Sequence, residues 1–517
     1  MNLEEDSSNY NNLQDLAEIK NIFQKEKHPQ LRLKLIELIA TSYKNGGIEF
    51  LKSQYKSCKD GSVRKRIVEI VGEEHINDSI AFFIEALNDA NIETKKIAII
   101  LLGNSYALSA IKPLIDLLQY GNVETNDLLI NSLVKIANQE EIQEIINYYE
   151  KGNLYIRRAI PVILEKVGNK KSVDFLISLL KDEDFLVRKS SIKALEKLIE
   201  LKNVRCILDS LNDQNIEVKK EAVRVLGNLG SRRAIKPLLE MLKEKDSSIR
   251  TLSRKSLFKI LTKSKSFEDL YDVVNGRNLS ARREVIILLG MLKDTNAINL
   301  LIKDLNSKVV SIRGAAYRAL LKILDHRIDD LIISALDDRL WRIRMYCVKI
   351  LGEIKDLSTI NHLFKLLGDD NNRVRGAAIN ALSKFEDENV ITLAKKSINT
   401  SNWKIRRSAV RLLIERKSKE SINTLIPLLN DNDVYIKSWA AMALGNLKGV
   451  DNIEPFVLLL RDNDDKIRIS AAKALGEIGN KKAIEFLIKS LADDNWDVRR
   501  EIENALNQID PKWMNHL

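Results

Sequence analysis

The sequence predicts an all-α fold, an α-α superhelix (a solenoid) of about sixteen repeats of 31 residues. A basic residue recurs along nearly the whole chain, and thirteen of the fifteen intervals between these positions are 31 residues long. The composition also favours helix, because Leu, Ile, Lys, Glu and Ala dominate and only seven prolines occur in 517 residues. Length alone would suggest about three globular domains, but a fixed period indicates stacked repeats instead.

We call the recurring residue the anchor. It is basic in fifteen of sixteen repeats, and Asn126 fills the remaining position. The basic anchors are Arg32, Arg64, Lys95, Arg157, Arg188, Lys219, Arg250, Arg282, Arg313, Arg344, Arg375, Arg406, Lys437, Arg468 and Arg499.

Each anchor is predicted to open an amphipathic helix, which we call helix B. Positions three, four and seven after the anchor are small or apolar and share one helical face. The seventh position is apolar in all sixteen repeats, as at Leu195, Leu226, Leu257, Leu320, Leu351, Leu382, Leu413, Leu444, Leu475 and Leu506. Gly often follows it, as at Gly227, Gly290, Gly352, Gly445 and Gly476. We expect helix B to stop at these glycines.

A second helix, helix A, is predicted before each helix B. An apolar residue recurs eight positions before the anchor, and Pro113, Pro237 and Pro455 occupy one register in the first turns of helix A, where a missing N–H costs little. A polar turn with Asp six residues before the anchor, as at Asp182 and Asp213, separates the two helices. Asp or Asn there can end helix A or cap helix B.

A single helix pair cannot bury its apolar face, so neighbouring pairs must stack. The segments Ala234–Leu239 and Asp462–Arg468, followed by Ala471, Ala472, Leu475, Gly476 and Ile478, resemble the short HEAT-like repeat named after the phycobiliprotein lyases. The resemblance covers residues 17–509, for which we predict one continuous solenoid. Residues 1–16 are expected to form a polar lead and residues 510–517 a tail.

The formal charge of +11 is concentrated in the middle of the chain. Residues 151–300 contain 31 basic and 19 acidic residues, whereas residues 1–150 contain 16 and 23. Basic residues one and five positions after the anchor lie on one face of helix B, which in solenoids is commonly the concave surface. They form a candidate binding stripe: Arg158, Lys189, Lys193, Lys220, Arg224, Lys255 and Arg283. The alternative is a solvated surface balanced by Asp and Glu of the neighbouring repeat.

The anchors and three tryptophans have structural interpretations. The anchors, with Asp six or four residues upstream, are predicted to form an intramolecular Asp–Arg ladder. Trp341, Trp403 and Trp496 lie three residues before an anchor, where other repeats carry aliphatic residues, and we expect them to be packing residues. Trp439 lies two residues after Lys437, away from the buried face, and is a candidate binding residue.

No pattern of catalytic or metal-binding residues is visible. The five histidines are isolated, with no HExxH or His-Glu pair, and Cys58, Cys206 and Cys347 lie far apart. Cys347 falls at a small buried position and is expected in the core. No phosphate-binding glycine motif or GxSxG occurs. We therefore expect no catalytic residues, metal or cofactor.

These observations favour a non-enzymatic scaffold or adaptor that binds protein partners through the B helices. The resemblance implies an alternative, a bilin lyase or chaperone acting on phycobiliproteins, and this is the enzymatic activity to consider if there is one. The basic middle third supports nucleic-acid binding as a further alternative. Neither a secretory leader nor a run of about 20 apolar residues is present, so we expect a cytoplasmic protein without membrane contact.

Overall fold

The computed structural model describes residues 16–120, 122–138, 140–264, 267–325, 329–416, 421–447 and 451–516. These residues form helices joined by turns and contain no strand, which confirms the predicted all-α class. The chain divides into two compact units, residues 1–266 and 267–517. The predicted lead lies almost wholly outside the described residues, and the continuity of the solenoid over residues 17–509 stays a prediction.

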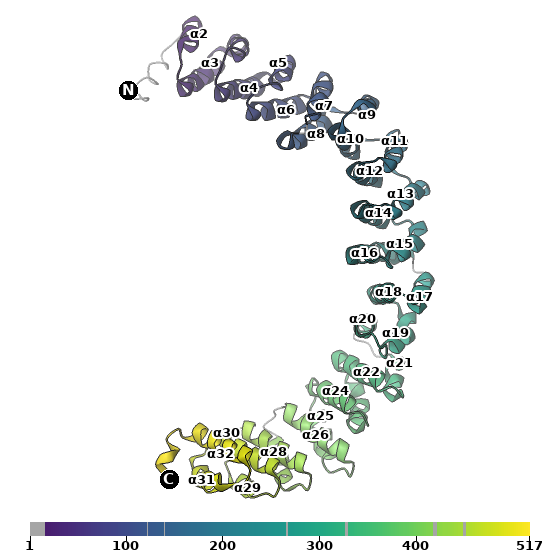
Figure 1. Cartoon of the computed structure of the whole chain (residues 1–517), viewed down its shortest axis with the longest axis vertical. Coiled ribbons are helices and arrows are strands. Elements are labelled where there is room, and N and C mark those ends of the chain that lie inside the picture. Colours follow the sequence, from purple (N-terminus) through teal and green to yellow (C-terminus); the bar gives the residue numbers. More distant parts are fainter. Residues whose placement is uncertain are drawn as a thin grey trace. The chain divides into compact units, whose positions relative to one another are not determined.

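In the first unit, long B helices alternate with shorter A helices in two layers, as α11 to α16 show clearly (Figure 1). Consecutive B helices pack against one another, as α12, α14 and α16 do. The B helices are α4 (Gly61–His75), α6 (Ile92–Ser105), α8 (Val123–Ile136), α10 (Leu154–Val167), α12 (Phe185–Leu198), α14 (Ile216–Leu229) and α16 (Ser247–Ser264). The A helices are α2 (Leu16–Lys25), α5 (Ile80–Ala86), α7 (Ile111–Leu118), α9 (Ile142–Lys151), α11 (Ser172–Ser178), α13 (Arg205–Asp209) and α15 (Ile235–Met241). One helix, α3 (Pro29–Tyr55), runs through a B segment and the next A segment without the predicted turn.

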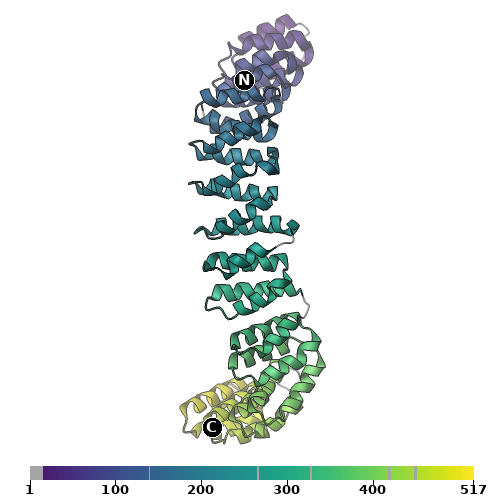
Figure 2. The same ribbon diagram turned by 90° about the vertical axis from the view of Figure 1, so that its right-hand side faces the viewer.

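The second unit repeats this arrangement, and its helix pairs also stack on one another (Figure 2). Its B helices are α18 (Leu279–Leu292), α20 (Val310–Leu324), α22 (Trp341–Ile354), α24 (Asn372–Ser383), α26 (Trp403–Arg416), α28 (Val434–Leu447), α30 (Asp465–Ile478) and α32 (Trp496–Ile509). Its A helices are α17 (Glu268–Asn275), α19 (Ile298–Asp304), α21 (Asp330–Ser334), α23 (Ile360–Lys365), α25 (Glu388–Ser397), α27 (Ile422–Leu425), α29 (Glu454–Leu459) and α31 (Ile484–Lys489).

Short 3-10 turns flank many A helices in both units. Those that follow an A helix are η3 (Leu179–Lys181), η5 (Ser210–Asn212), η8 (Ala335–Asp337), η10 (Leu366–Gly368), η12 (Ile426–Asn430) and η14 (Ser490–Ala492). Those that precede one are η1 (Asn77–Ser79), η2 (Leu108–Ala110), η4 (Leu201–Asn203), η6 (Arg232–Ala234), η7 (Thr295–Ala297), η9 (Leu357–Thr359) and η13 (Lys481–Ala483). In the predicted tail, η15 (Trp513–His516) forms a final turn.

The predicted period agrees with the helix starts, but each helix B begins three residues before the anchor that we expected to open it. Every anchor, from Arg32 to Arg499, is the fourth residue of its helix in the described chain. The apolar residue seven positions later is buried throughout, as Leu195 and Leu444 illustrate. In many repeats the side chain four positions before the anchor caps helix B: that of Asp184, for example, accepts hydrogen bonds from the N–H groups of Leu186 and Val187. His28, Val309 and Leu340 occupy this position without a side-chain cap.

The glycines that follow the seventh position do not end helix B, contrary to our expectation. Gly445 lies inside α28, and a Cβ on it would stand 2.7 Å from the Cα of Ala474 in α30. Gly227, Gly290, Gly352 and Gly476 make equally close approaches to the next B helix. Consecutive B helices therefore touch backbone to backbone at these glycines. The glycines that do cap a helix B in the described chain, Gly168, Gly230 and Gly479, lie eleven residues after the anchor, and φ is +70° at Gly230 and Gly479.

The predicted ladder of acidic and basic residues is present, but each rung joins two repeats. Arg188 Nε lies 2.7 Å from Asp213 Oδ2, an aspartate 25 residues ahead, while its Nη1 donates to the carbonyl oxygens of Asp182 and Glu183 in its own turn. Pairs with the same 25-residue spacing are Arg64–Asp89, Arg157–Asp182, Lys219–Glu244, Arg344–Asp369, Arg406–Asp431, Lys437–Asp462 and Arg468–Asp493. Arg188 therefore stabilises the turn before its own helix and links that turn to the next helix pair through the ion pair with Asp213.

Candidate functional site

The predicted basic stripe lies on the B helices as expected. Arg158 is on α10, Lys189 and Lys193 are on α12, Lys220 and Arg224 are on α14, Lys255 is on α16 and Arg283 is on α18. Except for Arg283, these residues belong to the first unit.

Carboxylates of neighbouring repeats neutralise most of this stripe. Arg158 Nη2 lies 2.5 Å from Asp184 Oδ2, and Lys189 and Lys220 share Glu217, each at 3.1 Å. In the second unit, Arg283 Nη1 lies 2.5 Å from Glu284 Oε1.

The carboxylate of Glu165 is the most enclosed partner in the stripe. Its side chain is 7% exposed, and Lys193 Nζ lies 3.0 Å from its Oε2. Lys166 and Lys197 each approach its Oε1 at 3.9 Å. Three lysines therefore compensate one buried carboxylate, which is a structural role for Lys193.

Arg224 is held in a similar way between two repeats. Its Nη2 lies 2.7 Å from Glu196 Oε2 on α12 and 2.5 Å from Glu221 Oε1 on α14. Burial by itself would raise the pKa of Glu196, but the hydrogen bonds from Arg224 and Asn228 outweigh it and hold that pKa below its usual value. Of the seven, only Lys255 makes no ion pair in the described chain, and its side chain is exposed. The stripe is thus charge-balanced, and its role in binding stays a prediction.

Trp439 lies beside a small pocket between α26 and α28. The pocket has a volume of about 250 Å³ and is lined by Arg411, Ile414, Glu415, Trp439, Met442, Ala443 and Asn446. A second pocket of about 380 Å³, lined by Ile414, Ala443, Asn446 and Leu447, adjoins it. A half-buried tryptophan next to an exposed methionine forms an apolar patch with polar groups at its edge, as binding pockets commonly do.

Aromatic rings and cations stack around this pocket. The rings of Tyr435 and Trp439 are 5.9 Å apart, and the guanidinium of Arg411 lies 5.7 Å from the Trp439 ring centre. Arg407 lies over two rings, 4.3 Å from that of Tyr435 and 4.8 Å from that of Trp403. The sequence pointed to Trp439, but it gave no sign that the neighbouring repeats supply these partners.

Two of the tryptophans three residues before the anchors, Trp403 and Trp496, are exposed at the surface, contrary to our expectation of packing residues. Trp403 is 47% exposed and Trp496 is 59% exposed, whereas Trp341 is half-buried. Aliphatic residues at this position, such as Val310 and Leu279, are exposed as well. The position is the first residue of helix B, where no preceding helical turn covers the side chain. Trp341 is covered instead by two guanidinium groups, those of Arg342 at 4.8 Å and Arg373 at 5.3 Å.

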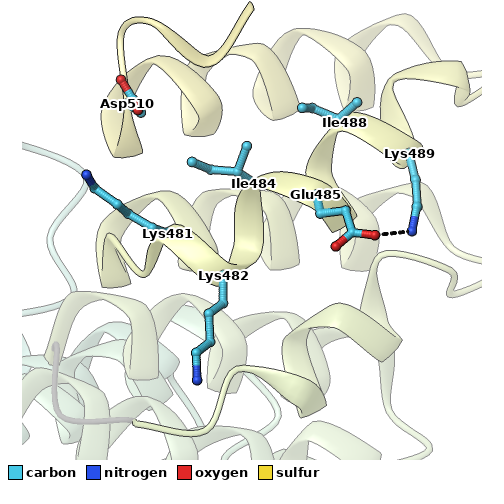
Figure 3. A pocket seen from close by; sticks show the side chains of 7 residues that line it. All are labelled: Lys481, Lys482, Ile484, Glu485, Ile488, Lys489 and Asp510. Atoms are coloured by element: carbon cyan, nitrogen blue, oxygen red, sulfur yellow. Dashed lines mark hydrogen bonds and ion pairs between the residues drawn. The ribbon is translucent and has the colours of Figure 1, made fainter. Parts of the chain in front are cut away.

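A further pocket lies beside α31 and contains none of the predicted site residues. It has a volume of about 550 Å³ and is lined by Lys481, Lys482, Ile484, Glu485, Ile488, Lys489 and Asp510 (Figure 3). Glu485 and Lys489 form an ion pair at 2.5 Å within it. Its apolar lining consists of Ile484 and Ile488, and each of its charged lining residues is exposed or half-buried.

The cysteines and histidines form no cluster in the described residues. Cys347 is fully buried, as expected, and burial raises the pKa of its thiol to about 12. His326 lies outside the described residues. No group of three or more His, Cys, Asp or Glu side chains able to hold a metal ion occurs in the parts of the chain that the structure describes. None of the helices in those parts is long and apolar enough to span a membrane.

Comparison with known proteins identifies the repeat. The sequence profile of HEAT repeats matches residues 204–275, 328–402, 392–457 and 453–512. No curated protein matches the chain.

Several solved structures match the chain at low sequence identity. The crystal structure of Kap121p is 14% identical, with a TM-score of 0.40, over 90% of this chain and 57% of Kap121p. Kap95p, from a structure with RanGDP, is 13% identical, with a TM-score of 0.35, over 90% of this chain and 61% of that one. The chain therefore spans less than two thirds of the length of these proteins. The narrower resemblance to phycobiliprotein-lyase repeats stays a prediction, and the chain is an all-helical solenoid that contains HEAT repeats.

Proposed function

We propose that this chain is a non-enzymatic scaffold that binds protein partners through the B-helix surface of its second unit. The observation that supports this proposal is the cluster of Trp403, Arg407, Arg411, Tyr435 and Trp439 beside the α26–α28 pocket. Trp, Tyr and Arg are enriched among the few residues that dominate the binding energy at protein interfaces, because they combine a large apolar area with a polar group. Burying exposed aromatic rings against a partner is more favourable in free energy than leaving them in water.

Site-specific photo-crosslinking in the native cell tests the proposal. Met442 lies on α28 at the pocket and is 37% exposed, so a photoreactive benzoylphenylalanine placed there faces any partner of the B helices. Leu458 on α29 is the matched control, because it is exposed but belongs to an A helix. We expect a discrete protein adduct from position 442 and none from position 458.

The opposite pattern would contradict the proposal. If adducts form only from position 458, partners bind the A helices instead. If neither position yields a protein adduct, the B-helix surface of the second unit is not a protein-binding surface.

A further inference from the structure

We define the aromatic–arginine face as a set of residues at the N-terminal ends and outer surfaces of five consecutive B helices, α22 to α30. Its members are Trp341, Arg342, Arg373, Trp403, Arg407, Arg411, Tyr435, Trp439 and Lys466. Every one of these residues takes part in a contact between a cation and a ring. All belong to the second unit, and consecutive helices in this series contact each other.

Several cations of this face have no anionic partner. Arg342, Arg373, Arg411 and Lys466 have no carboxylate within 4.0 Å in the described chain, although Arg407 pairs with Asp433. The basic stripe of the first unit differs, because almost all of its cations are paired. The face therefore presents uncompensated positive charge, which complements an anionic ligand.

Stacking leaves the donors of these guanidinium groups available. An arginine on an aromatic ring uses its planar face, whereas its five N–H groups point outward at the edge of that plane. The ring also restricts the side chain, so less conformational entropy is lost when a carboxylate binds in a two-pronged manner. The guanidinium carbons of Arg342 and Arg373 lie 4.8 and 5.3 Å from the ring centre of Trp341, and that of Arg411 lies 5.7 Å from the ring centre of Trp439.

The same stacking argues against nucleic acid. In proteins that bind single-stranded nucleic acid, the bases stack on the free faces of aromatic side chains. Here two cations lie over the ring of Trp341, and Arg407 and Lys466 both lie over the ring of Tyr435. These rings already have stacking partners, while the guanidinium edges remain suited to carboxylates.

We propose that the aromatic–arginine face binds an extended acidic peptide segment of a partner protein, with one apolar side chain of that segment in the Trp439 pocket. This inference rests on the proposed scaffold function and specifies its ligand. Five adjacent B helices at roughly 10 Å per step span about 40 Å. An extended chain of about twelve residues covers that distance. Carboxylates would bind Arg342, Arg373 and Arg411, and the pocket would select a Leu or Phe.

Binding of a defined peptide to the full chain tests this inference by fluorescence anisotropy. The probe is a fluorescein-labelled twelve-residue peptide of Glu and Asp with a central Leu-Phe pair, and the reference peptide has Ser in place of every acid. We expect saturable binding of the acidic peptide only, weakening as salt rises. The triple variant Arg342→Glu, Arg373→Glu, Arg411→Glu should weaken binding at least tenfold. Trp439→Ala should weaken binding of this peptide severalfold but leave an acidic peptide without Leu-Phe unchanged.

A matched charge reversal separates this face from general electrostatics. The triple variant Lys189→Glu, Lys220→Glu, Lys255→Glu changes the net charge equally in the first unit and should leave binding within twofold. Equal losses in both triple variants, or no saturable binding at low salt, would overturn the inference. Tighter binding of a twelve-nucleotide oligo-dT, with displacement of the peptide, would assign the face to nucleic acid instead. Circular dichroism establishes that each variant is folded.

The two proposals fail in different experiments. If the acidic peptide does not bind but position 442 crosslinks to a protein, the scaffold stands and the acidic ligand is wrong. If position 442 gives no protein adduct, the scaffold itself is wrong.

Discussion

Replacing Arg188 with Met tests whether the inter-repeat ladder stabilises the solenoid. Arg188 donates two hydrogen bonds to the carboxylate of Asp213, at 2.7 and 2.8 Å, and two more to the carbonyl oxygens of Asp182 and Glu183. Methionine fills a similar space but donates none of them. The change therefore loosens the turn before α12 and leaves Asp213 with one neutral donor, the N–H of Asn215.

The burial of the pair sets the size of the effect. The Arg188 side chain is 14% exposed and that of Asp213 is 10% exposed. Removing one partner of a buried ion pair lowers the free energy of unfolding by about 3–5 kcal/mol. Because this pair is partly exposed, we expect a loss of about 3 kcal/mol. That figure corresponds to about a hundredfold increase in local opening.

Lys170 provides the matched control. Its ion pair with Glu200 also joins two repeats, at 3.3 Å, but the lysine side chain is 86% exposed. Lys170→Met should therefore have little effect.

Hydrogen exchange measured by mass spectrometry suits this test, because repeat arrays can unfold in parts and a single global free energy can hide a local effect. Amides of α12 and α14 should exchange about a hundred times faster in Arg188→Met than in the wild type. In Asp213→Asn the further addition of Arg188→Met should cost much less, because the pair is already broken. Equal, small effects of Arg188→Met and Lys170→Met would refute the reasoning.

Three further predictions follow from the packing and the caps. In denaturant unfolding, Gly445→Val should destabilise the second unit by about 1–3 kcal/mol, because the valine side chain would press on Ala474. Gly376→Ala is the control and should be neutral or stabilising, because a Cβ there would have no neighbour within 4 Å. Asn371→Ala removes the N-cap hydrogen bond that the Arg373 N–H donates to the Asn371 side chain, and it should lower the free energy of unfolding by about 1 kcal/mol in the same measurement. Asn380→Ala, on the exposed side of α24, should cause no such loss. Burial alone would raise the pKa of Asp213, but its hydrogen bonds from Arg188 and Asn215 lower that pKa below its value in the unfolded chain. The ionised Asp213 therefore contributes its full share to the free energy of unfolding above about pH 4, and this share is lost as the pH falls through the pKa of the folded state. Urea midpoints measured from pH 6 to pH 3 should fall less steeply in Asp213→Asn, and a parallel fall would contradict the assignment.

The sequence predicted the fold well because the repeat places the same requirement on every copy. A single register marked an equivalent residue near the start of each B helix and the buried apolar residue seven positions later. The glycines were misjudged because a single repeat does not reveal what lies opposite it. Gly445 looks like a helix terminator until Ala474 of the next helix is seen against it.

The candidate site was less predictable, because it depends on which side chains of different repeats meet. The cations near Lys193 and Arg224 are evident in the sequence, but their neutralisation by Glu165 and Glu196 depends on packing between repeats. Trp403 was mistaken for a packing residue because its position is apolar in most repeats, and an apolar position at a helix start can still face solvent. Trp439 was predicted as a binding residue only because its position, two residues after the anchor Lys437, lies away from the buried face of helix B.

The ladder also has a gap, and the gap predicts how the first unit responds to force. Neither Lys95 nor Asn126 forms an ion pair in the described chain, and the buried Oδ1 of Asn126 has no hydrogen-bond partner there. Two successive rungs are therefore missing between α6 and α10. If the ends of this unit are pulled apart, as in a single-molecule stretching experiment, we expect the first rupture at this segment. The helices on either side would then separate as intact blocks, so the unit would lengthen in steps and refold without losing its outer repeats.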